Sequence, residues 1–360
     1  MERFIGLDVH LASTTVAVIG PSGKHLQTQV LETNGEALVT FLRSIPGHRR
    51  VCMEEGTQSA WLYEILSPHA DEVVVVGVGA SRGQKSDARD ARSLAERLRT
   101  GAIEIRVFKD HGRYRDLREL GRAHAMVVRD VVRVKNRLKS FYRSRGVLTS
   151  GKAVYGEKAR GEWLSRLPDG TRAATETLYA QHDALMDIRK RSEKALVAAA
   201  RKDPIFRVLE TCPGLGPIRV AQLIPIVVTP HRFRTKRQLW AYCGLGIVMR
   251  SSSDWVRETG GAWQRAKVQQ TRGLNYNHNH TLKMIFKGAA TTVINQLPNE
   301  PLHMDYQNLL VAGTKPNLAK LTLARKIAAI ALAIWKTEED YDPKKYRKQS
   351  KLALGEQAPI

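Results

Sequence analysis

The chain has 360 residues, which is enough for two or three domains with hydrophobic cores of their own. Hydrophobic residues make up 42% of the composition, and this excludes an intrinsically disordered chain. The formal net charge at pH 7 is +23, and the isoelectric point is about 10.1. Because like charges repel one another in a folded protein, this excess predicts a polyanionic partner, and we expect nucleic acid.

Cysteine usage and hydropathy indicate the cellular compartment in which we expect the protein. The three cysteines, Cys52, Cys212 and Cys243, are far apart in the sequence. An odd and sparse set predicts neither a disulfide framework nor a zinc site, so we expect a reducing, cytoplasmic location. We expect no signal peptide before the first strand, and the apolar run 327–335 is too short to span a bilayer, so no membrane partner is predicted.

Residues 1–110 alternate predicted strands and helices. Strands are predicted at 4–7, 15–19, 25–30, 51–53 and 72–78. Helices are predicted at 34–42, which Asn34 and Gly35 open, at 59–66 and at 90–98. The run at 72–78 is almost all valine, which is typical of a buried strand. Three consecutive strands, followed by helices and strands in alternation, predict an α/β domain with a mixed sheet.

A long basic helix is predicted from about residue 113 to residue 145. Apolar residues recur at helical spacing from Leu117 to Leu138, with arginine and lysine between them. Acidic residues are nearly absent from 122 to 145, so we expect this face to contact phosphates, and a solvated charged face is the alternative. The residues that we assign to nucleic-acid contact here are Arg129, Arg133, Lys135 and Arg137.

A second long helix is predicted at about 171–200, after a polar, glycine-rich loop at 146–169. Two long helices in succession predict a helical hairpin or a coiled-coil arm.

Residues 204–335 predict further helices and two loops. The run Cys212-Pro213-Gly214-Leu215-Gly216-Pro217 predicts a helix–hairpin–helix turn, and its backbone N–H groups at Gly214 and Gly216 can bind a phosphate. A plain connector is the alternative.

A polar loop then carries three serines at 251–253, and we assign Arg250 and Arg272 around it to nucleic-acid contact. The lysine-rich tail at 336–360 has no apolar periodicity, so it predicts a disordered or phosphate-contacting extension.

Acidic residues at strand ends and on one helix are candidates for a metal site. Asp8 ends the first predicted strand, and Glu54 and Glu55 follow the strand at 51–53. Asp87 and Asp90 are three residues apart, and on a helix such residues share a face, so both carboxylates could point at one spot. Such oxygen-rich sites suit Mg²⁺ or Mn²⁺ and phosphoryl chemistry, whereas ordinary surface or capping acids are the alternative.

Four stretches of the chain, in this order, resemble the DEDD-type insertion-sequence transposases, serine-dependent recombinases guided by a bridge RNA. The stretches are Ile5-Gly6-Leu7-Asp8-Val9-His10, Glu55-Gly56-Thr57, Lys85-Ser86-Asp87-Ala88-Arg89-Asp90-Ala91, and Pro213-Gly214-Leu215-Gly216 through Gly244-Leu245 to the serine loop. The resemblance implies an α/β RuvC-like (RNase H-type) domain at 1–110 and a helical, coiled-coil middle at 111–203. It also implies a mainly α-helical transposase domain at 204–335, followed by the basic tail at 336–360.

The resemblance also implies a function. The enzyme would be a recombinase that cuts and rejoins donor and target DNA under the guidance of a bridge RNA, as a homo-oligomer, either a dimer or a tetramer. The residues implied as catalytic Mg²⁺ (or Mn²⁺) ligands are Asp8, Glu55, Asp87 and Asp90, and Ser252 is implied as the nucleophile.

The chain departs from the family pattern in several places, and two of them leave the assignment of a residue open. It has Ser251-Ser252-Ser253-Asp254 where the family has Ser-Gly, so Ser251 and Ser253 are register alternatives to Ser252. Glu54 is likewise an alternative to Glu55. Two other functions also fit: a RuvC-like metal-dependent nuclease for branched DNA without a covalent serine step, and a non-catalytic nucleic-acid-binding protein.

Overall fold

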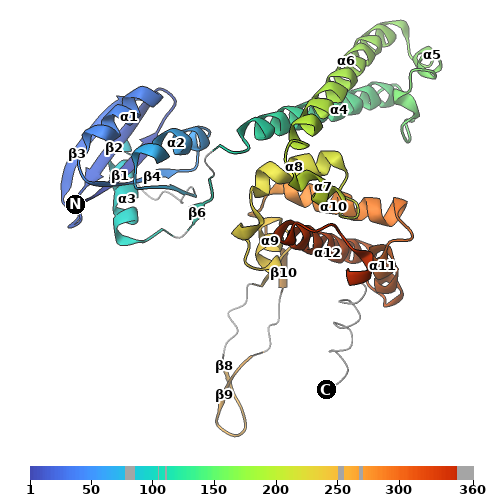
Figure 1. Cartoon of the computed structure of the whole chain (residues 1–360). Coiled ribbons are helices and arrows are strands. Elements are labelled where there is room, and N and C mark those ends of the chain that lie inside the picture. The colour runs from blue at the N-terminus through green and yellow to red at the C-terminus, as the bar shows by residue number, and fades with distance from the viewer. Residues whose placement is uncertain (78–85, 104, 110–111, 250–254, 267–270, 347–360) are drawn as a thin grey trace. The chain divides into compact units, whose positions relative to one another are not determined.

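The computed structural model describes residues 1–77, 86–103, 105–109, 112–249, 255–266 and 271–346. The chain divides into two compact units, Met1–Arg113 and Tyr114–Ile360 (Figure 1). The first unit is α/β and the second is mainly helical, as the sequence predicts.

The first unit is built on a six-stranded sheet in the order β3-β2-β1-β4-β5-β6. The strands are β1 (Glu2–Val9), β2 (Ser13–Ile19), β3 (His25–Glu32), β4 (His48–Glu54), β5 (Glu72–Val76) and β6 (Arg106–Val107). β4 pairs in parallel with β1 and β5, and the other pairs are antiparallel. This mixed sheet is of the RNase H type, which confirms the predicted fold class.

Helices cover both faces of this sheet (Figure 1). The helices α1 (Gly35–Ser44) and α2 (Ser59–Leu66) pack on the face that carries Ile5 and Leu7, with the short η1 (Ser67–His69) after α2. The helix α3 (Asp87–Thr100) packs on the other face, against Phe4 and Cys52. Because side chains alternate between faces along a strand, Asp8 lies on the same face as Phe4, which is the α3 face.

The close approach of α3 to β1 depends on Gly6. A Cβ atom at Gly6 would lie 1.9 Å from the carbonyl oxygen of Ala91 and 2.7 Å from the backbone nitrogen of Ala95. Both alanines are fully buried, and their small side chains let the helix lie flat on the strand. Since Asp87 is one turn before Ala91 on the same helix face, this contact brings Asp87 to Asp8.

The second unit begins with a helical hairpin. Its helices α4 (Arg115–Arg143) and α6 (Asp169–Ala200) pack against each other (Figure 1). The buried side chains of α4 recur at helical spacing and include Leu117, Val131, Val134, Leu138 and Tyr142. The predicted limits of both helices therefore agree closely with the structure, and a coiled-coil contact between chains stays a prediction.

The segment between these helices is more ordered than its glycine content suggests. It contains η2 (Ala153–Tyr155) and α5 (Arg160–Ser165). Val154 is buried with Tyr142 and Tyr179 in a small separate core. The two tyrosine hydroxyls lie 3.0 Å apart, and that of Tyr179 donates to the Val154 carbonyl oxygen at 2.8 Å. The loop predicted at 146–169 thus folds into a small cap on the hairpin.

The remainder of the second unit is a helical body. Its helices are α7 (Ile205–Glu210), α8 (Pro217–Val227), α9 (Lys236–Tyr242), α10 (His280–Gln296), α11 (Pro301–Val311) and α12 (Pro316–Thr337), with η3 (Pro230–Arg232) between α8 and α9. The helix α12 packs against α7, α9, α10 and α11. Of the helices that the structure describes, none combines the length and apolar character that crossing a membrane requires.

Two features of this body differ from the sequence-based expectation. Two small antiparallel sheets, β7 (Ile247–Met249) with β10 (Thr271–Leu274) and β8 (Trp255–Arg257) with β9 (Trp263–Arg265), lie in the segment expected to be a polar loop. The start of the predicted basic tail also packs on the body, because the rings of Tyr341 and Tyr346 contact its core. Residues 347–360 lie outside the described residues.

Candidate metal centre and nucleic-acid surfaces

Asp8, His10 and Asp87 come together at the C-terminal end of β1. His10 Nε2 lies 3.4 Å from Asp8 Oδ2 and 3.6 Å from Asp87 Oδ2. One possible ligand atom from each of the three residues lies within 4.8 Å of the other two. The side chain of Asp8 is 23% exposed, whereas those of His10 and Asp87 are 53% and 59% exposed. The group is therefore anchored on the strand and open toward solvent.

The electrostatics of this group suit a cation. Burial raises the pKa of Asp8 above its usual range, because burial disfavours the charged carboxylate. His10 opposes this effect, while the charges of Asp87 and Asp90 raise the pKa of Asp8 further. A divalent cation would relieve the repulsion among these carboxylates, and their oxygen donors fit Mg²⁺ or Mn²⁺.

Asp90 lies near this group without belonging to its closest set. It occupies the first turn of α3 together with Asp87, and its backbone N–H donates to the Ser86 carbonyl oxygen at 2.9 Å. Its charge acts on Asp8, but its oxygens lie outside the 4.8 Å set formed by Asp8, His10 and Asp87. Acids in the first turn also interact favourably with the helix dipole, which stabilises this arrangement.

Glu55, the glutamate assigned from the sequence, points to a different partner. Its Oε1 accepts a hydrogen bond from Lys109 Nζ at 3.0 Å, and its backbone N–H donates to the Val76 carbonyl oxygen at 2.8 Å. Glu55 lies just past the end of β4, and its carboxylate is not in the 4.8 Å set.

Glu54, unlike Glu55, is in register with Asp8 across the parallel strands β1 and β4. In the parallel pair of β1 and β4, Gly6 lies opposite Cys52, so Asp8 and Glu54 are two residues further along in the same register. Cys52 packs on the α3 face, and residues two apart on a strand share a face. The register therefore favours Glu54 as the glutamate on the α3 face, beside Asp8.

Two features of the centre were not assigned from the sequence. His10 belongs to the stretch Asp8-Val9-His10, and the signal was its spacing, since side chains two apart on a strand point the same way. Gly6 had no signal of its own, because its role depends on a helix that follows much later in the chain.

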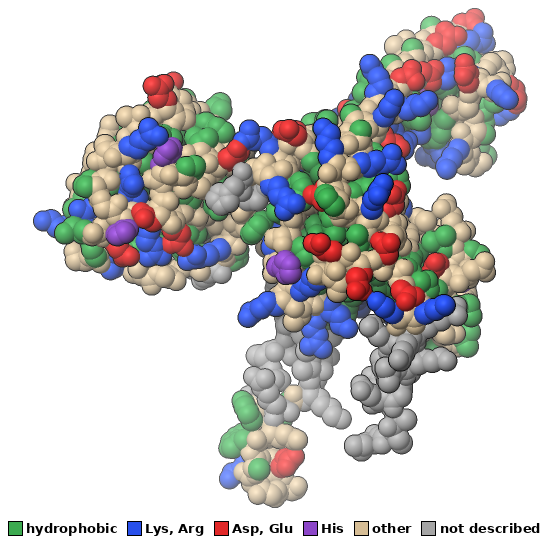
Figure 2. All heavy atoms as spheres, viewed as in Figure 1, with side chains coloured by type: hydrophobic (Ala, Val, Ile, Leu, Met, Phe, Trp, Pro, Cys, Tyr) green, Lys and Arg blue, Asp and Glu red, His purple; other side chains and the backbone are tan. Residues whose placement is uncertain are grey.

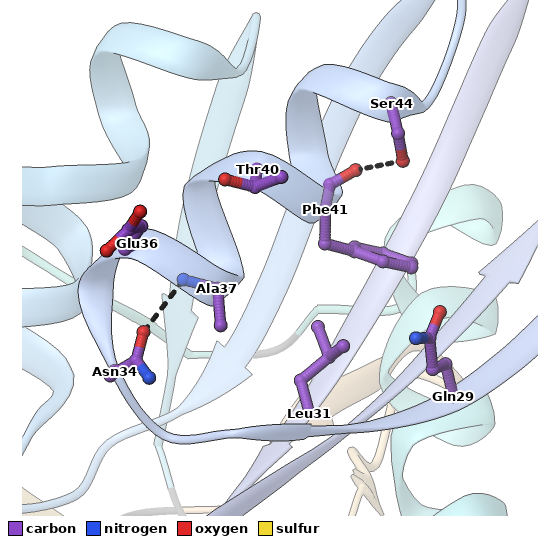
Figure 3. Close-up of a pocket in the computed structure, with 8 residues that line it drawn as sticks. All are labelled: Gln29, Leu31, Asn34, Glu36, Ala37, Thr40, Phe41 and Ser44. Carbon is purple, nitrogen blue, oxygen red and sulfur yellow. Dashed lines mark hydrogen bonds between the residues drawn. The ribbon is translucent and has the colours of Figure 1, made fainter.

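A separate pocket lies on the opposite side of the sheet, between β3 and α1 (Figure 3). Its volume is about 530 Å³, and it is lined by Gln29, Leu31, Asn34, Glu36, Ala37, Thr40, Phe41 and Ser44. Asn34 caps α1 by accepting a hydrogen bond from the Ala37 backbone N–H at 2.7 Å, and Ser44 Oγ donates to the Phe41 carbonyl oxygen at 2.7 Å. Among these described lining residues Glu36 is the one acid, so the pocket does not resemble the acid group on the α3 face.

The basic residues assigned on α4 divide into two kinds. Arg129, Arg133 and Arg137 are exposed, although Arg133 also pairs with Asp130 at 2.8 Å. Lys135 instead lies over the ring of Tyr155, with 5.1 Å from its Nζ to the ring centroid, and burial lowers its pKa. Figure 2 shows lysine and arginine side chains spread over both units among acidic ones. The arginines of α4 are thus available to phosphates, whereas Lys135 is engaged within the hairpin.

The glycines of the predicted helix–hairpin–helix turn have different surroundings. Gly214 has a φ of +79°, and a Cβ atom there would lie 2.4 Å from the carbonyl oxygen of Ala289 on α10. Gly216 precedes α8, and a Cβ atom there would meet nothing within 4 Å. Packing therefore accounts for Gly214, while the space beside Gly216 is open.

In the sequence, the serine loop lies between the two strands β7 and β10, which pair with each other. The strand β7 ends at Met249 and pairs with β10, in which Arg272 lies. Before β7 in the sequence, Gly244 has a φ of +64°, and a Cβ atom there would lie 2.4 Å from the ring of His278. The serines Ser251, Ser252 and Ser253 and the neighbouring Arg250 lie outside the described residues.

Comparison with known families matches this architecture. Residues 5–144 match the profile of DEDD transposases described as "Transposase", and residues 206–272 match the profile described as "Transposase IS116/IS110/IS902 family". The RNase H-type sheet and its acidic centre thus lie within a transposase catalytic domain of the DEDD type. More particularly, the chain belongs to the IS110 family of insertion-sequence transposases.

One curated relative is similar over much of the chain. It is a protein of Sinorhizobium fredii (strain NBRC 101917 / NGR234) that is named as a presumed transposase, y4pF/y4sB. The two sequences are 24% identical over 264 residues, which is 71% of this chain. The match spans 64% of the length of that relative.

Proposed function

We propose that this chain is the transposase of an insertion sequence, a metal-dependent enzyme that cuts and rejoins DNA strands. The observation that carries the proposal is the group of Asp8, His10 and Asp87 at the end of β1, in a chain of the IS110 family. The net charge of +23 adds support, because the substrate is a polyanion.

We propose Asp8, Asp87 and Asp90 as metal ligands, together with one glutamate from the end of β4. The strand register supports Glu54, and Glu55, which the sequence suggested, is the alternative. A bound Mg²⁺ or Mn²⁺ would polarise the scissile phosphodiester and stabilise the charge that develops on the leaving oxygen.

The residues of the chain would hold and orient the substrate around this centre. The half-exposed Asp87 and His10 leave the open side of the group accessible to a phosphodiester. The exposed arginines of α4 would contact phosphates of the nucleic-acid backbone. Each such contact releases counterions from the nucleic acid, so the binding affinity would depend on salt.

A serine, Ser252 in the sequence register, would act as the nucleophile, with Ser251 and Ser253 as alternatives. Its Oγ forms a bond to phosphorus as the bond from phosphorus to a deoxyribose oxygen breaks. The serine hydroxyl gives up its proton, and the leaving deoxyribose oxygen takes one up. A DNA hydroxyl later attacks the same phosphorus, loses its proton and displaces the serine, which regains one, so the bond energy is conserved for rejoining.

The partners that we propose are donor and target DNA, a structured bridge RNA, and further copies of this chain in a dimer or a tetramer. The resemblance to bridge-RNA-guided recombinases supports the RNA, and the long hairpin of α4 and α6 supports a coiled-coil contact between copies.

The test of the metal centre uses DNA that carries the ends of the element, together with the RNA that copurifies with the protein. We expect Asp8→Asn or Asp87→Asn to reduce strand cleavage in Mg²⁺ by a factor on the order of 100 or more, because one charged ligand is removed. Glu54→Gln and Glu55→Gln compare the two glutamates, and Asp71→Asn, at a surface pair with His48, is the matched control. Near wild-type cleavage by Asp8→Asn would exclude the proposed centre.

The test of the serine uses a nicked suicide substrate and denaturing electrophoresis. We expect Ser252→Ala to bind DNA normally but to form no covalent protein–DNA adduct. If only the triple Ser251/Ser252/Ser253→Ala variant loses the adduct, the nucleophile is one of the other two serines. If the triple variant cleaves normally, a hydrolytic RuvC-like nuclease replaces the recombinase as the function.

A further inference from the structure

Three lysines line a cleft between α10 and α12. These two helices pack against each other (Figure 1). We name this cleft the α10–α12 cleft. Its volume is about 380 Å³, and its lining includes His280, Lys283, Lys287, Thr291 and Lys320. None of the described residues that line it is acidic.

The lysines on α10 form a single row. Lys283, Lys287 and Thr291 are four residues apart, so they share one helix face, with about 6 Å of helix rise between successive members. Lys320 reaches the same cleft from α12, and the largely exposed side chain of Met284 adjoins it. The cleft therefore presents a line of cations with an apolar side chain beside it.

This placement of charge is unfavourable for the isolated protein. Helix N-termini carry a partial positive charge, which disfavours cations in the first turns. Neither α10 nor α12 contains an aspartate or glutamate, and like charges at positions i and i+4 repel each other. Lys283, at the end of the first turn of α10, is thus disfavoured by the helix dipole, and Lys283 and Lys287 repel each other. A bound polyanion would offset this repulsion.

Other cations of α12 have protein partners. Arg325 Nε donates to the Leu245 carbonyl oxygen at 2.6 Å, Lys326 pairs with Asp305 at 2.7 Å, and Lys336 Nζ donates to the Phe233 carbonyl oxygen at 2.6 Å. Among the residues that the structure describes, Lys283, Lys287 and Lys320 form no ion pair with a carboxylate. These three ammonium groups are therefore available to a ligand.

We propose that the α10–α12 cleft binds the phosphodiester backbone of a nucleic acid, a role that rests on the proposed function and extends it to a surface outside the metal centre. Ammonium groups in a row bind successive phosphates, whereas the Thr291 hydroxyl donates to the Lys287 carbonyl oxygen at 2.9 Å, so the contact depends on the lysines. The contact is with the backbone, so it positions the strand without reading its sequence.

The experiment measures binding of the full-length protein to two labelled probes, a random-sequence DNA duplex and a structured RNA, by fluorescence anisotropy. The variants are Lys283→Gln/Lys287→Gln and Lys320→Gln. The control is Lys24→Gln/Lys202→Gln, which removes the same charge as the double variant from two exposed lysines outside the cleft. Salt is varied between about 0.05 and 0.2 M.

For duplex DNA, the slope of log K against log salt should become shallower by about 0.9 for each phosphate that the variant no longer neutralises. If affinity at 1 M salt is unchanged, this corresponds to binding about fivefold weaker for Lys320→Gln and about 30-fold weaker for the double variant near 0.15 M salt. The control should change binding by less than about twofold. Thermal stability of the double variant should be equal to or above that of the wild type, because repulsion is removed.

The two probes distinguish the source of the phosphates. Weaker binding of one probe alone identifies the cleft as a DNA or an RNA site, and weaker binding of both identifies a shared backbone site. The inference is overturned if the double variant keeps the wild-type slope with both probes, or if the control weakens binding equally. In either case, the proposed function is still supported if the wild-type protein binds DNA. If the wild type binds neither probe, the proposed function and the proposed role of the cleft are both refuted.

Discussion

The contact between α3 and β1 predicts that Gly6→Ala disrupts the candidate metal centre. The added Cβ atom would lie 1.9 Å from the Ala91 carbonyl oxygen, whereas real Cβ atoms keep at least 3.0 Å. The helix must therefore move away by about 1.1 Å, the difference between 3.0 and 1.9 Å. Because Asp87 is one turn from Ala91, the same movement separates Asp87 from Asp8.

The expected magnitude follows from the nature of the clash. Overpacking of a core costs about 1–3 kcal/mol, and the upper end applies here because the obstacle is helix backbone and cannot rotate away. A destabilisation of about 3 kcal/mol corresponds to amide exchange about 100-fold faster wherever global opening of the first unit controls exchange. The altered geometry between Asp87 and Asp8 should also weaken Mn²⁺ binding by at least about tenfold, or 1.4 kcal/mol.

The assay is hydrogen exchange of peptides from β1 and α3 in the full-length chain, combined with titration calorimetry of Mn²⁺. Gly20→Ala is the matched control, because a Cβ atom there would meet Leu26 Cδ1 at 3.8 Å, an ordinary contact in the same unit. The reasoning is refuted if Gly6→Ala exchanges within about threefold of the wild type and binds Mn²⁺ normally.

Two further predictions concern charge. Because burial raises the folded-state pKa of Asp8 above the unfolded value of about 3.9, the contribution of Asp8 to the stability of the metal-free protein is lost as pH rises from about 4 through the folded pKa. Asp8→Asn should therefore melt at a higher temperature than the wild type at neutral pH in a chelator, with no difference at pH about 3, and an unchanged melting temperature at neutral pH would contradict this. Replacement of Arg129, Arg133 and Arg137 by glutamine should reduce the salt slope of DNA binding by up to about 2.7, at about 0.9 for each phosphate. An unchanged slope would identify this face of α4 as solvated.

Local patterns predicted most of the elements correctly. The helix predicted at 59–66 has the observed limits of α2, and the long helices α4 and α6 differ from the prediction by only a few residues. Asn34 was placed correctly at the start of α1, where its side chain caps the helix. These features depend on periodicity and capping, which involve neighbours within a few positions in the chain.

The composition of the candidate centre was only partly predictable. Asp8 and Asp87 were expected to converge, and they do. The sequence pointed to Glu55, but strand register favours Glu54, because the face on which a side chain lies is set by pairing with β1. The structure also adds His10 to this group. The strand β1 extends to Val9, and side chains alternate along it, so His10 lies on the same side as Asp8.

The sequence by itself determined the order of the first five strands and of the long helices, the family resemblance and the excess of positive charge. Tertiary structure alone decided which distant residues lie together. Ala91 packs against Gly6, Ala289 packs against Gly214, and Lys320 lines the same cleft as the lysines of α10. Such contacts join residues far apart in the chain, and they depend on how closely two backbones approach. A local pattern carries no information about that distance, because it is set by the packing of whole elements.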